Sequence, residues 1–179
     1  MPVMASRTEP ECYSFEDDGV FPNGKHPALI YRGALDKQGD LARAFETLFA
    51  GNGWTSAWRD GLFTFHHYHS TAHEVLGIYR GTVRVALGGP GRGGRLIDLQ
   101  AGDVIVVPAG LAHKNDRQSN DFATVGAYPR GTSYDMMYGE KEERPQADRN
   151  IARLPVPPSD PVEGAQGSLP RLWTRASRG

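Results

Sequence analysis

The sequence contains a single cysteine, Cys12, among its 179 residues. One cysteine excludes an internal disulfide and is typical of a reducing compartment. The chain also lacks any apolar run approaching the roughly 18 residues that a membrane helix requires. Its first residues lack the apolar core of a secretory signal. We therefore expect a cytoplasmic protein with no membrane partner.

Neither sign of charge dominates, since 20 basic and 21 acidic residues give a formal net charge of −1. A nucleic-acid-binding surface normally shows as an excess or a cluster of Lys and Arg. The glycine-rich run at residues 88–94 lies between two expected strands, whereas a phosphate-binding loop precedes a helix. We therefore expect a hairpin loop there and no nucleic-acid partner.

Turn-forming residues are abundant, with 22 Gly and 13 Pro, and they separate short apolar runs. Strands are predicted at residues 26–32, 62–68, 75–79, 82–87, 96–99, 104–107, 112–114, 122–128 and 134–137. Many short strands without strand–helix alternation predict an all-β sandwich or barrel rather than a parallel α/β sheet. The first of these strands begins with Pro27, which suits the edge of a sheet.

One helix is expected, from about residue 40 to 50, because Leu41, Phe45, Leu48 and Phe49 fall on one face. Asp40 is a suitable N-cap, and the apolar face would cover one flank of the sheet. The barrel domain is then expected to span residues 26–138, preceded by a polar arm at residues 1–25.

The composition changes after residue 138, where a charged stretch is followed by a proline-rich one. Prolines favour extended backbone and disrupt ladder pairing, so residues 139–179 predict an extended C-terminal segment. That segment ends in an apolar cluster of Leu169, Leu172 and Trp173. We expect it to wrap over the barrel or over a neighbouring subunit, and a solvated tail is the alternative.

Metal-binding side chains gather in two stretches, residues 61–81 and 102–115. His67 and His69 lie two apart, so on a strand they share one face. Glu74 begins the next expected strand, and His113 follows a Pro-Ala-Gly turn. Three imidazoles and one carboxylate suit one divalent ion such as Fe, Mn, Ni or Zn. An ion that only clips strands together is the alternative, although structural zinc sites are usually closed by Cys or His.

These two stretches resemble the two sequence motifs of the cupin superfamily. The places of the first motif are filled by Gly61, His67, His69, Glu74 and Gly81. Those of the second are filled by Gly102, Pro108, Gly110 and His113, while Arg117 stands where the family has asparagine. The sequence of residues 66–81 further resembles that of a bacterial subgroup of cupins called YjlB-like.

The resemblance implies a double-stranded β-helix, the cupin-type jelly-roll barrel, with the ion inside it. It also implies a homodimer, and activities that range over oxygenases, isomerases and lyases. Four protein ligands around an octahedral ion would leave two positions open for substrate.

The expected pocket residues are Phe63, Phe65, Trp58 and Tyr134. Phe63 and Phe65 alternate with the histidines in the right phase to form an apolar wall. The candidate acid–base residues are His73, Tyr128 and Lys114. An exposed loop histidine is the alternative for His73, and tyrosine is a common strand residue, so most of these side chains are expected to be structural.

Two functions are compatible with these residues. The first is a metal-dependent enzyme of the oxygenase, isomerase or lyase type, acting on a small oxygen-bearing metabolite that chelates the ion. The second is a metal-anchored module that binds or senses a small molecule without converting it.

Overall fold

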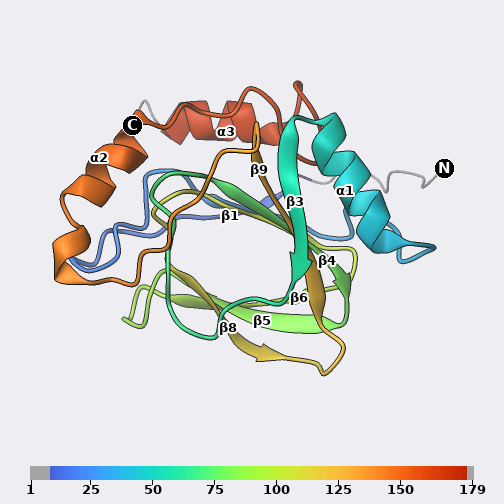
Figure 1. Cartoon of the computed structure of the whole chain (residues 1–179), viewed down its shortest axis with the longest axis horizontal. Coiled ribbons are helices and arrows are strands. Elements are labelled where there is room, and N and C mark those ends of the chain that lie inside the picture. The colour runs from blue at the N-terminus through green and yellow to red at the C-terminus, as the bar shows by residue number, and fades with distance from the viewer. Residues whose placement is uncertain (1–8, 177–179) are drawn as a thin grey trace.

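Two antiparallel sheets form the body of the protein, in a computed structural model that describes residues 9–176 (Figure 1). The larger sheet has the strand order β1-β2-β7-β4-β9-β3, and the smaller has the order β6-β5-β8. The described strands are β1 (Glu11–Tyr13), β2 (Ala28–Tyr31), β3 (Trp54–Asp60), β4 (Glu74–Arg80), β5 (Thr82–Leu87), β6 (Arg95–Gln100), β7 (Val104–Val107), β8 (His113–Gln118) and β9 (Ala123–Pro129). This arrangement confirms the predicted all-β, jelly-roll architecture.

The inner strands of the larger sheet, β2, β7, β4 and β9, are buried on both faces. Alternate residues of β4 contribute to two apolar clusters, Val75 to the outer one and Leu76 to the one between the sheets. In β7, Val104 and Ile105 divide in the same way. Because both faces are covered, these strands are continuous apolar runs rather than alternating ones.

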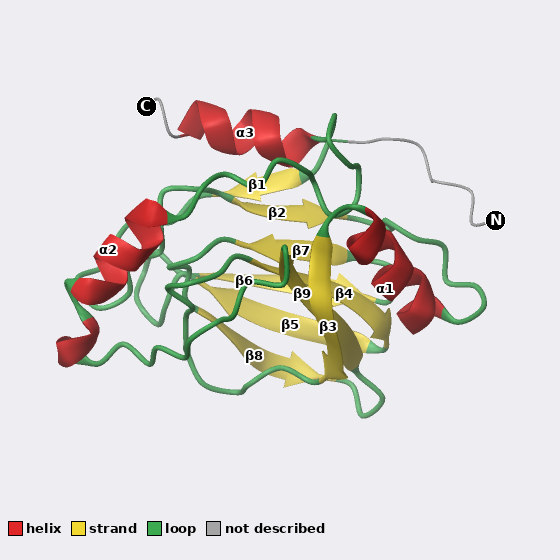
Figure 2. Ribbon diagram, turned by 45° about the horizontal axis from the view of Figure 1, so that its top comes forward, coloured by secondary structure: helices red, strands yellow, loops and turns green. Residues whose placement is uncertain are grey.

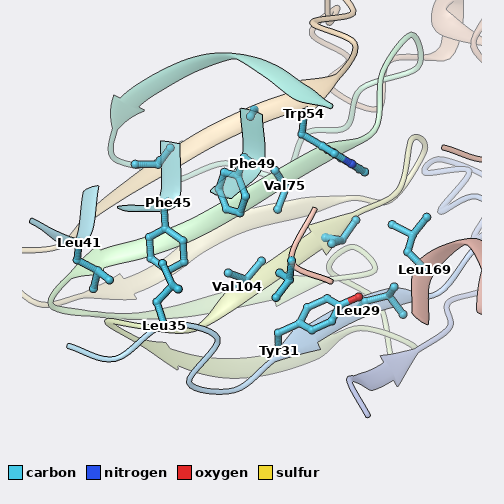
Figure 3. Close-up of a cluster of buried hydrophobic side chains, with 14 of the residues drawn as sticks. Leu29, Tyr31, Leu35, Leu41, Phe45, Phe49, Trp54, Val75, Val104 and Leu169 are labelled. Atoms are coloured by element: carbon cyan, nitrogen blue, oxygen red, sulfur yellow. The ribbon is translucent and has the colours of Figure 1, made fainter. Parts of the chain in front are cut away.

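Helix α1 (Leu41–Gly51) covers the outer face of the larger sheet, as predicted (Figure 3). Asp40 caps it, since its carboxylate accepts a 3.0 Å hydrogen bond from the Arg43 amide. Phe45 and Phe49 are fully buried in the outer cluster. A Cβ at Gly77 of β4 would lie 2.8 Å from the Phe45 ring, so glycine is what lets the helix approach this closely.

The strand predicted at residues 62–68 does not form, and this prediction was wrong. Its only ladder contacts are isolated bridges, from His67 to His113 and from Tyr68 to Met137. The segment leaves β3, at the edge of the larger sheet, and crosses to β8, at the edge of the smaller one. Because it passes between two sheets, it finds too few neighbouring backbone groups for a continuous ladder. The strand predicted at residues 134–137 is reduced to the Met137 bridge in the same way.

The edge position predicted for β2 was also wrong. The short strand β1 pairs with β2 on the side away from β7, so β2 lies inside the sheet. Sequence reasoning placed β1 within a polar arm, because three residues with a charged first member show no strand pattern.

The C-terminal segment is not extended throughout, contrary to prediction. It contains a 3₁₀ turn (Lys141–Glu143) and the helices α2 (Gln146–Arg153) and α3 (Ser168–Ala176). Figure 2 shows α3 lying along the β1–β2 end of the larger sheet. Leu169 and Trp173 are fully buried, and Trp173 Nε1 donates a 3.0 Å hydrogen bond to the Pro27 carbonyl. A contact with a neighbouring subunit stays a prediction.

Asp160 fixes the entry to α3. Its carboxylate accepts hydrogen bonds from the amides of Val162 (2.8 Å), Glu163 (2.9 Å) and Leu169 (3.0 Å) and from the Tyr31 hydroxyl. This buried carboxylate therefore joins the C-terminal segment to β2. None of the described helices is both long enough and apolar enough to cross a membrane.

Candidate metal centre

Three buried imidazoles meet between the crossing segment and the smaller sheet. Each of His67, His69 and His113 offers one ring nitrogen, and these atoms all lie within 4.8 Å of one another. His67 and His113 form an antiparallel bridge, with N–H···O distances of 3.1 and 2.9 Å, so their rings lie side by side at 4.1 Å. We call these three residues the triad.

Each ring of the triad is oriented by a backbone carbonyl. Nδ1 of His67 lies 2.9 Å from the Phe65 carbonyl, and Nδ1 of His113 lies 2.9 Å from that of Leu111. Nδ1 of His69 lies 2.6 Å from the carbonyl of Asp135. Because Nδ1 must carry the hydrogen to donate, Nε2 keeps its lone pair and is free to coordinate an ion.

Glu74, the first residue of β4, completes the donor set. Its Oε1 lies 3.7 Å from Nε2 of His69 and 3.7 Å from Nε2 of His113. Nε2 of His113 is buried and has no hydrogen-bond partner among the described residues. A buried nitrogen without a partner, next to a buried carboxylate, is explained if both groups are metal ligands. Three imidazole nitrogens and one carboxylate oxygen fit a divalent transition-metal ion.

For Glu74 and His67 the electrostatics favour the form that binds a cation. Burial by itself raises the pKa of Glu74, but the neighbouring imidazoles of His113 and His69 outweigh it and hold the pKa below its usual value. Burial, assisted by His113, lowers the pKa of His67 to about 3. Burial also acts to lower the pKa of His69, but the Glu74 carboxylate outweighs it and raises that pKa. At neutral pH the site therefore holds an ionised carboxylate and a neutral His67.

A chain of hydrogen bonds reaches Glu74 from the strands beside it. The Tyr128 hydroxyl donates to Glu74 Oε2 at 3.0 Å, and Trp58 Nε1 donates to the Tyr128 oxygen at 2.7 Å. A Cβ at Gly126 would lie 2.2 Å from the Trp58 ring, so only glycine allows the indole to lie across β9. Burial and the Glu74 charge raise the pKa of Tyr128, which keeps its hydroxyl protonated and donating.

The donor set opens into a pocket of about 380 Å³, the triad pocket. Two triad members, His67 and His69, line it together with Glu74. Its remaining wall consists of Trp58, Arg59, Asp60, Gly61, Leu62, Phe63, Tyr128 and Tyr134. Phe63 and Tyr134 are about half exposed, at 51% and 46%, so aromatic rings form the mouth.

The structure brings most of the predicted pocket residues together. Trp58, Phe63 and Tyr134 line the triad pocket. Phe65 does not line it, but its ring stacks on Phe63 at 5.1 Å and meets His67 edge-on at 5.6 Å. Of the predicted acid–base residues, Tyr128 lines the pocket.

His73 and Lys114 do not reach the triad pocket. His73 lines a separate cavity, and its Nδ1 accepts a 2.9 Å hydrogen bond from the Ala109 amide. Burial lowers the pKa of His73 to about 3. Lys114 follows His113 on β8 and so lies on the opposite face, 3.8 Å from the Asp116 carboxylate.

One supporting residue was missed by sequence reasoning. The carbonyl of Asp135 orients His69, and its carboxylate accepts hydrogen bonds from the Ser70 amide (2.6 Å) and hydroxyl. Asn150 of α2 donates a 3.1 Å hydrogen bond to the same Ser70 hydroxyl. Asp135 lies 65 positions from Ser70 in the chain, and Asn150 lies 80 positions from it, so no local sequence pattern could have linked them.

Comparisons with known proteins identify the family of this chain. Residues 59–131 match the family model described as Cupin. The chain is 38% identical over 168 residues to "Uncharacterized protein YjlB" of Bacillus subtilis (strain 168), covering 93% of this chain and 98% of the relative.

Solved structures give lower similarity. A single-residue mutant of Bacillus subtilis oxalate decarboxylase OxdC matches with a TM-score of 0.39 and 15% identity, over 87% of this chain and 32% of that one. The 11S globulin from Wrightia tinctoria matches with a TM-score of 0.36 and 16% identity, over 45% of this chain and 21% of that one. The chain thus spans between a fifth and a third of these two solved chains. Because the sequence match to YjlB extends over nearly the whole of both proteins, the chain belongs to the cupin family.

Proposed function

We propose that this cupin is a metal-dependent enzyme acting on a small oxygen-bearing metabolite that chelates the ion. The ion would be held by the triad and Glu74. The observation that carries the proposal is the set of three buried imidazoles with Nδ1 engaged by carbonyls and Nε2 free, beside a carboxylate and open to a pocket. A site that only clipped strands together would have no need of the opening.

A divalent ion bound here would polarise an oxygen of the substrate as a Lewis acid. The chain's own residues set the surroundings. Tyr128 holds Glu74 in place and keeps a proton at its hydroxyl on the pocket wall. The aromatic mouth, with Phe63 and Tyr134, limits water and so strengthens electrostatic interactions inside the pocket. A volume of about 380 Å³ restricts the substrate to a small metabolite.

One observation favours the second function, a metal-anchored binding or sensing module without catalysis. Two of the three predicted acid–base residues, His73 and Lys114, lie outside the triad pocket. The third, Tyr128, has a pKa raised by burial and by Glu74, which makes it a weak acid at neutral pH. The choice between the two functions therefore depends on whether a bound molecule is converted.

The first test is the metal content of protein purified without a metal-affinity column. We expect about one equivalent of a divalent transition metal by mass spectrometry. Cobalt(II)-substituted protein should then change its visible absorption when titrated with azide, because a position at the ion is open. The proposal would be contradicted if the visible absorption of the bound ion does not change on addition of azide. It would also be contradicted if the protein binds no metal from a buffered excess.

The second test separates the two functions. Metal-loaded protein is incubated with a panel of small hydroxy acids, keto acids and sugars, and turnover and binding are both recorded. Conversion that disappears in Glu74→Gln supports the enzyme. Tight binding of one compound with no conversion supports the module. A homodimer stays a prediction, which sedimentation of the same sample would check.

A further inference from the structure

A second cavity, of about 350 Å³, lies away from the triad pocket. It is bounded by the start of β3, the turn after β9 and residues 154–159 of the C-terminal segment. No residue lines both this cavity and the triad pocket. Its volume falls within the range of small-molecule sites, about 300–1,000 Å³.

The larger part of the wall is apolar. Trp54, Ala72 and Val156 contribute to it, with prolines on either side of Val156. Proline has no backbone N–H, so this stretch offers an occupant no amide donors at those positions. Trp54 Nε1 is already used, because it donates a 2.9 Å hydrogen bond to the Ser159 carbonyl. A molecule lying against this wall must therefore be apolar there.

The wall holds one buried nitrogen without a hydrogen-bond partner among the described residues and one exposed arginine. The imidazole of His73 is 4% exposed, and because its Nδ1 accepts from the Ala109 amide, its hydrogen is carried by Nε2. That Nε2 is buried without a hydrogen-bond partner in the described chain. The Pro155 carbonyl lies near the ring and acts to raise the pKa of His73, but it is not aligned to accept a hydrogen bond from Nε2.

The arginine is Arg130, an exposed residue that lines the cavity and makes no ion pair with any carboxylate of residues 9–176. Its backbone is held in the left-handed region, with φ of 53°, and its amide donates a 2.8 Å hydrogen bond to the Gly53 carbonyl. A non-glycine residue with positive φ costs free energy, and such strain is often found at binding sites. The wall thus carries one cation and one neutral donor, with hydrocarbon beside them.

We infer that this cavity binds a small apolar molecule that ends in a carboxylate. The carboxylate pairs with Arg130 and accepts from His73 Nε2, and the hydrocarbon lies against Trp54 and Val156. An anion accepts the His73 Nε2 hydrogen and pairs with the Arg130 cation, whereas an amine would be repelled by Arg130 and would leave the His73 hydrogen unbonded. This site does not depend on the proposed function of the triad pocket.

The segments that bound the cavity continue along the chain into segments that line the triad pocket. His73 directly precedes Glu74, and Arg130 lies between Tyr128 and Tyr134. A carboxylate bound between His73 and Arg130 therefore holds together the two backbone segments that carry the triad pocket.

The test is a calorimetric titration of full-length protein with octanoate, in parallel with octylamine. It is run on metal-loaded protein and on protein dialysed against EDTA, since a carboxylate could also bind at the ion. We expect saturable 1:1 binding of octanoate in both samples and none of octylamine. Absence of saturable octanoate binding, or its loss on removal of the metal, would overturn the inference.

Three variants locate the binding. Arg130→Gln should weaken octanoate about tenfold or more, because it removes a charge-assisted interaction. Val156→Trp should abolish binding by filling the cavity. Arg43→Gln, which removes an exposed charge from α1, is the matched control and should bind like the unmodified protein. Equal affinity in Arg130→Gln and the unmodified protein, or an equal loss in Arg43→Gln, would overturn the assignment even if Val156→Trp fails to fold.

Discussion

The chain buries two clusters of histidines, and they differ in what surrounds them. The triad faces the Glu74 carboxylate, and each of its rings is oriented by a backbone carbonyl. In the other cluster, His26 stacks on Trp173 at 4.7 Å and His73 meets the same indole edge-on at 4.8 Å. Neither of these two imidazoles forms an ion pair with a carboxylate in the described chain.

The pKa of His69 expresses the same difference, whereas burial lowers the pKa of His67 as it does in the second cluster. Burial lowers the pKa of His26 to about 4 and that of His73 to about 3, as for imidazoles placed in an apolar core. In the triad, the Glu74 carboxylate overrides burial and raises the pKa of His69. Burial without a neighbouring carboxylate lowers the pKa of an imidazole and keeps it neutral, as in a histidine that only packs in a core. A buried carboxylate beside several free Nε2 atoms makes a place for a cation.

The largest expected effect is on metal affinity, and it should separate the two clusters. His113→Ala removes a ligand and should weaken metal binding by more than about 100-fold, which exceeds the usual loss for groups outside the ligand set. His26→Phe, which keeps a ring against Trp173, should bind metal normally. Competition with a chromophoric chelator measures both. Full retention of metal by His113→Ala would remove the distinction between the clusters.

Metal removal should destabilise the protein through the triad only. An ion at 100 times its dissociation constant stabilises the folded state by about 2.7 kcal/mol. Chelation should therefore lower the melting temperature of the unmodified protein and of His26→Phe alike. The His113→Ala variant should melt at the same temperature with and without chelator, as followed by circular dichroism. A drop of equal size in His113→Ala would place the ion elsewhere.

In metal-free protein, acid should destabilise the fold through the second cluster as well as through His67. The unfolded chain protonates His26 near its ordinary pKa of 6.5, whereas the folded chain does so only at about 4. The contribution of His26 to the free energy of unfolding is therefore unchanged above pH 6.5 and is lost as the pH falls toward 4. For this residue the loss amounts to about 2–3 kcal/mol. Urea unfolding of metal-free protein at pH 7 and pH 4 should show a smaller loss in His26→Phe, and equal losses would contradict this account.

The smallest effect expected is that of Tyr128→Phe. It deletes the hydroxyl that donates to Glu74 Oε2 and should weaken metal binding about tenfold, or about 1.4 kcal/mol. Tyr134→Phe is the matched control, because Tyr134 stacks on Tyr128 and lines the same pocket while its hydroxyl makes no hydrogen bond within the described residues. The same chelator competition applies. Equal affinities for the two variants would show that the hydroxyl is dispensable.

Several features of the molecule were predictable because they depend on neighbours in the chain. The helix α1 followed from the spacing of its apolar residues and from the Asp40 cap, and the β4 and β5 strands from short apolar runs between turns. The convergence of His67 and His113 followed from motif spacing, and the structure places the two rings side by side. For the helix and the strands, the residues that decide the structure lie within a few positions of one another, whereas His67 and His113 come from two separate motifs.

What escaped prediction depends on contacts between distant parts of the chain. Phe63 and Phe65 have the alternation of a strand, but the segment crosses from one sheet to another and forms no ladder. Helix α3 lies in a proline-rich region, yet Leu169 and Trp173 gain enough burial against the sheet to make it helical. His73 and Lys114 were chosen for proximity in sequence, and alternation of side chains along the backbone directs them away from the pocket.

The hydrogen bond from Asn150 to Ser70 has a consequence for how this protein tolerates cleavage. Through Ser70 and Asp135 it connects a helix near the C-terminus to the orientation of His69. A protease that cuts in the turn before α2 would leave every candidate ligand residue in the larger fragment. It would separate Asn150 from that fragment and so remove a hydrogen bond that supports the orientation of His69. A cut far from the ion would then weaken metal binding, because the His69 ring would be less well oriented.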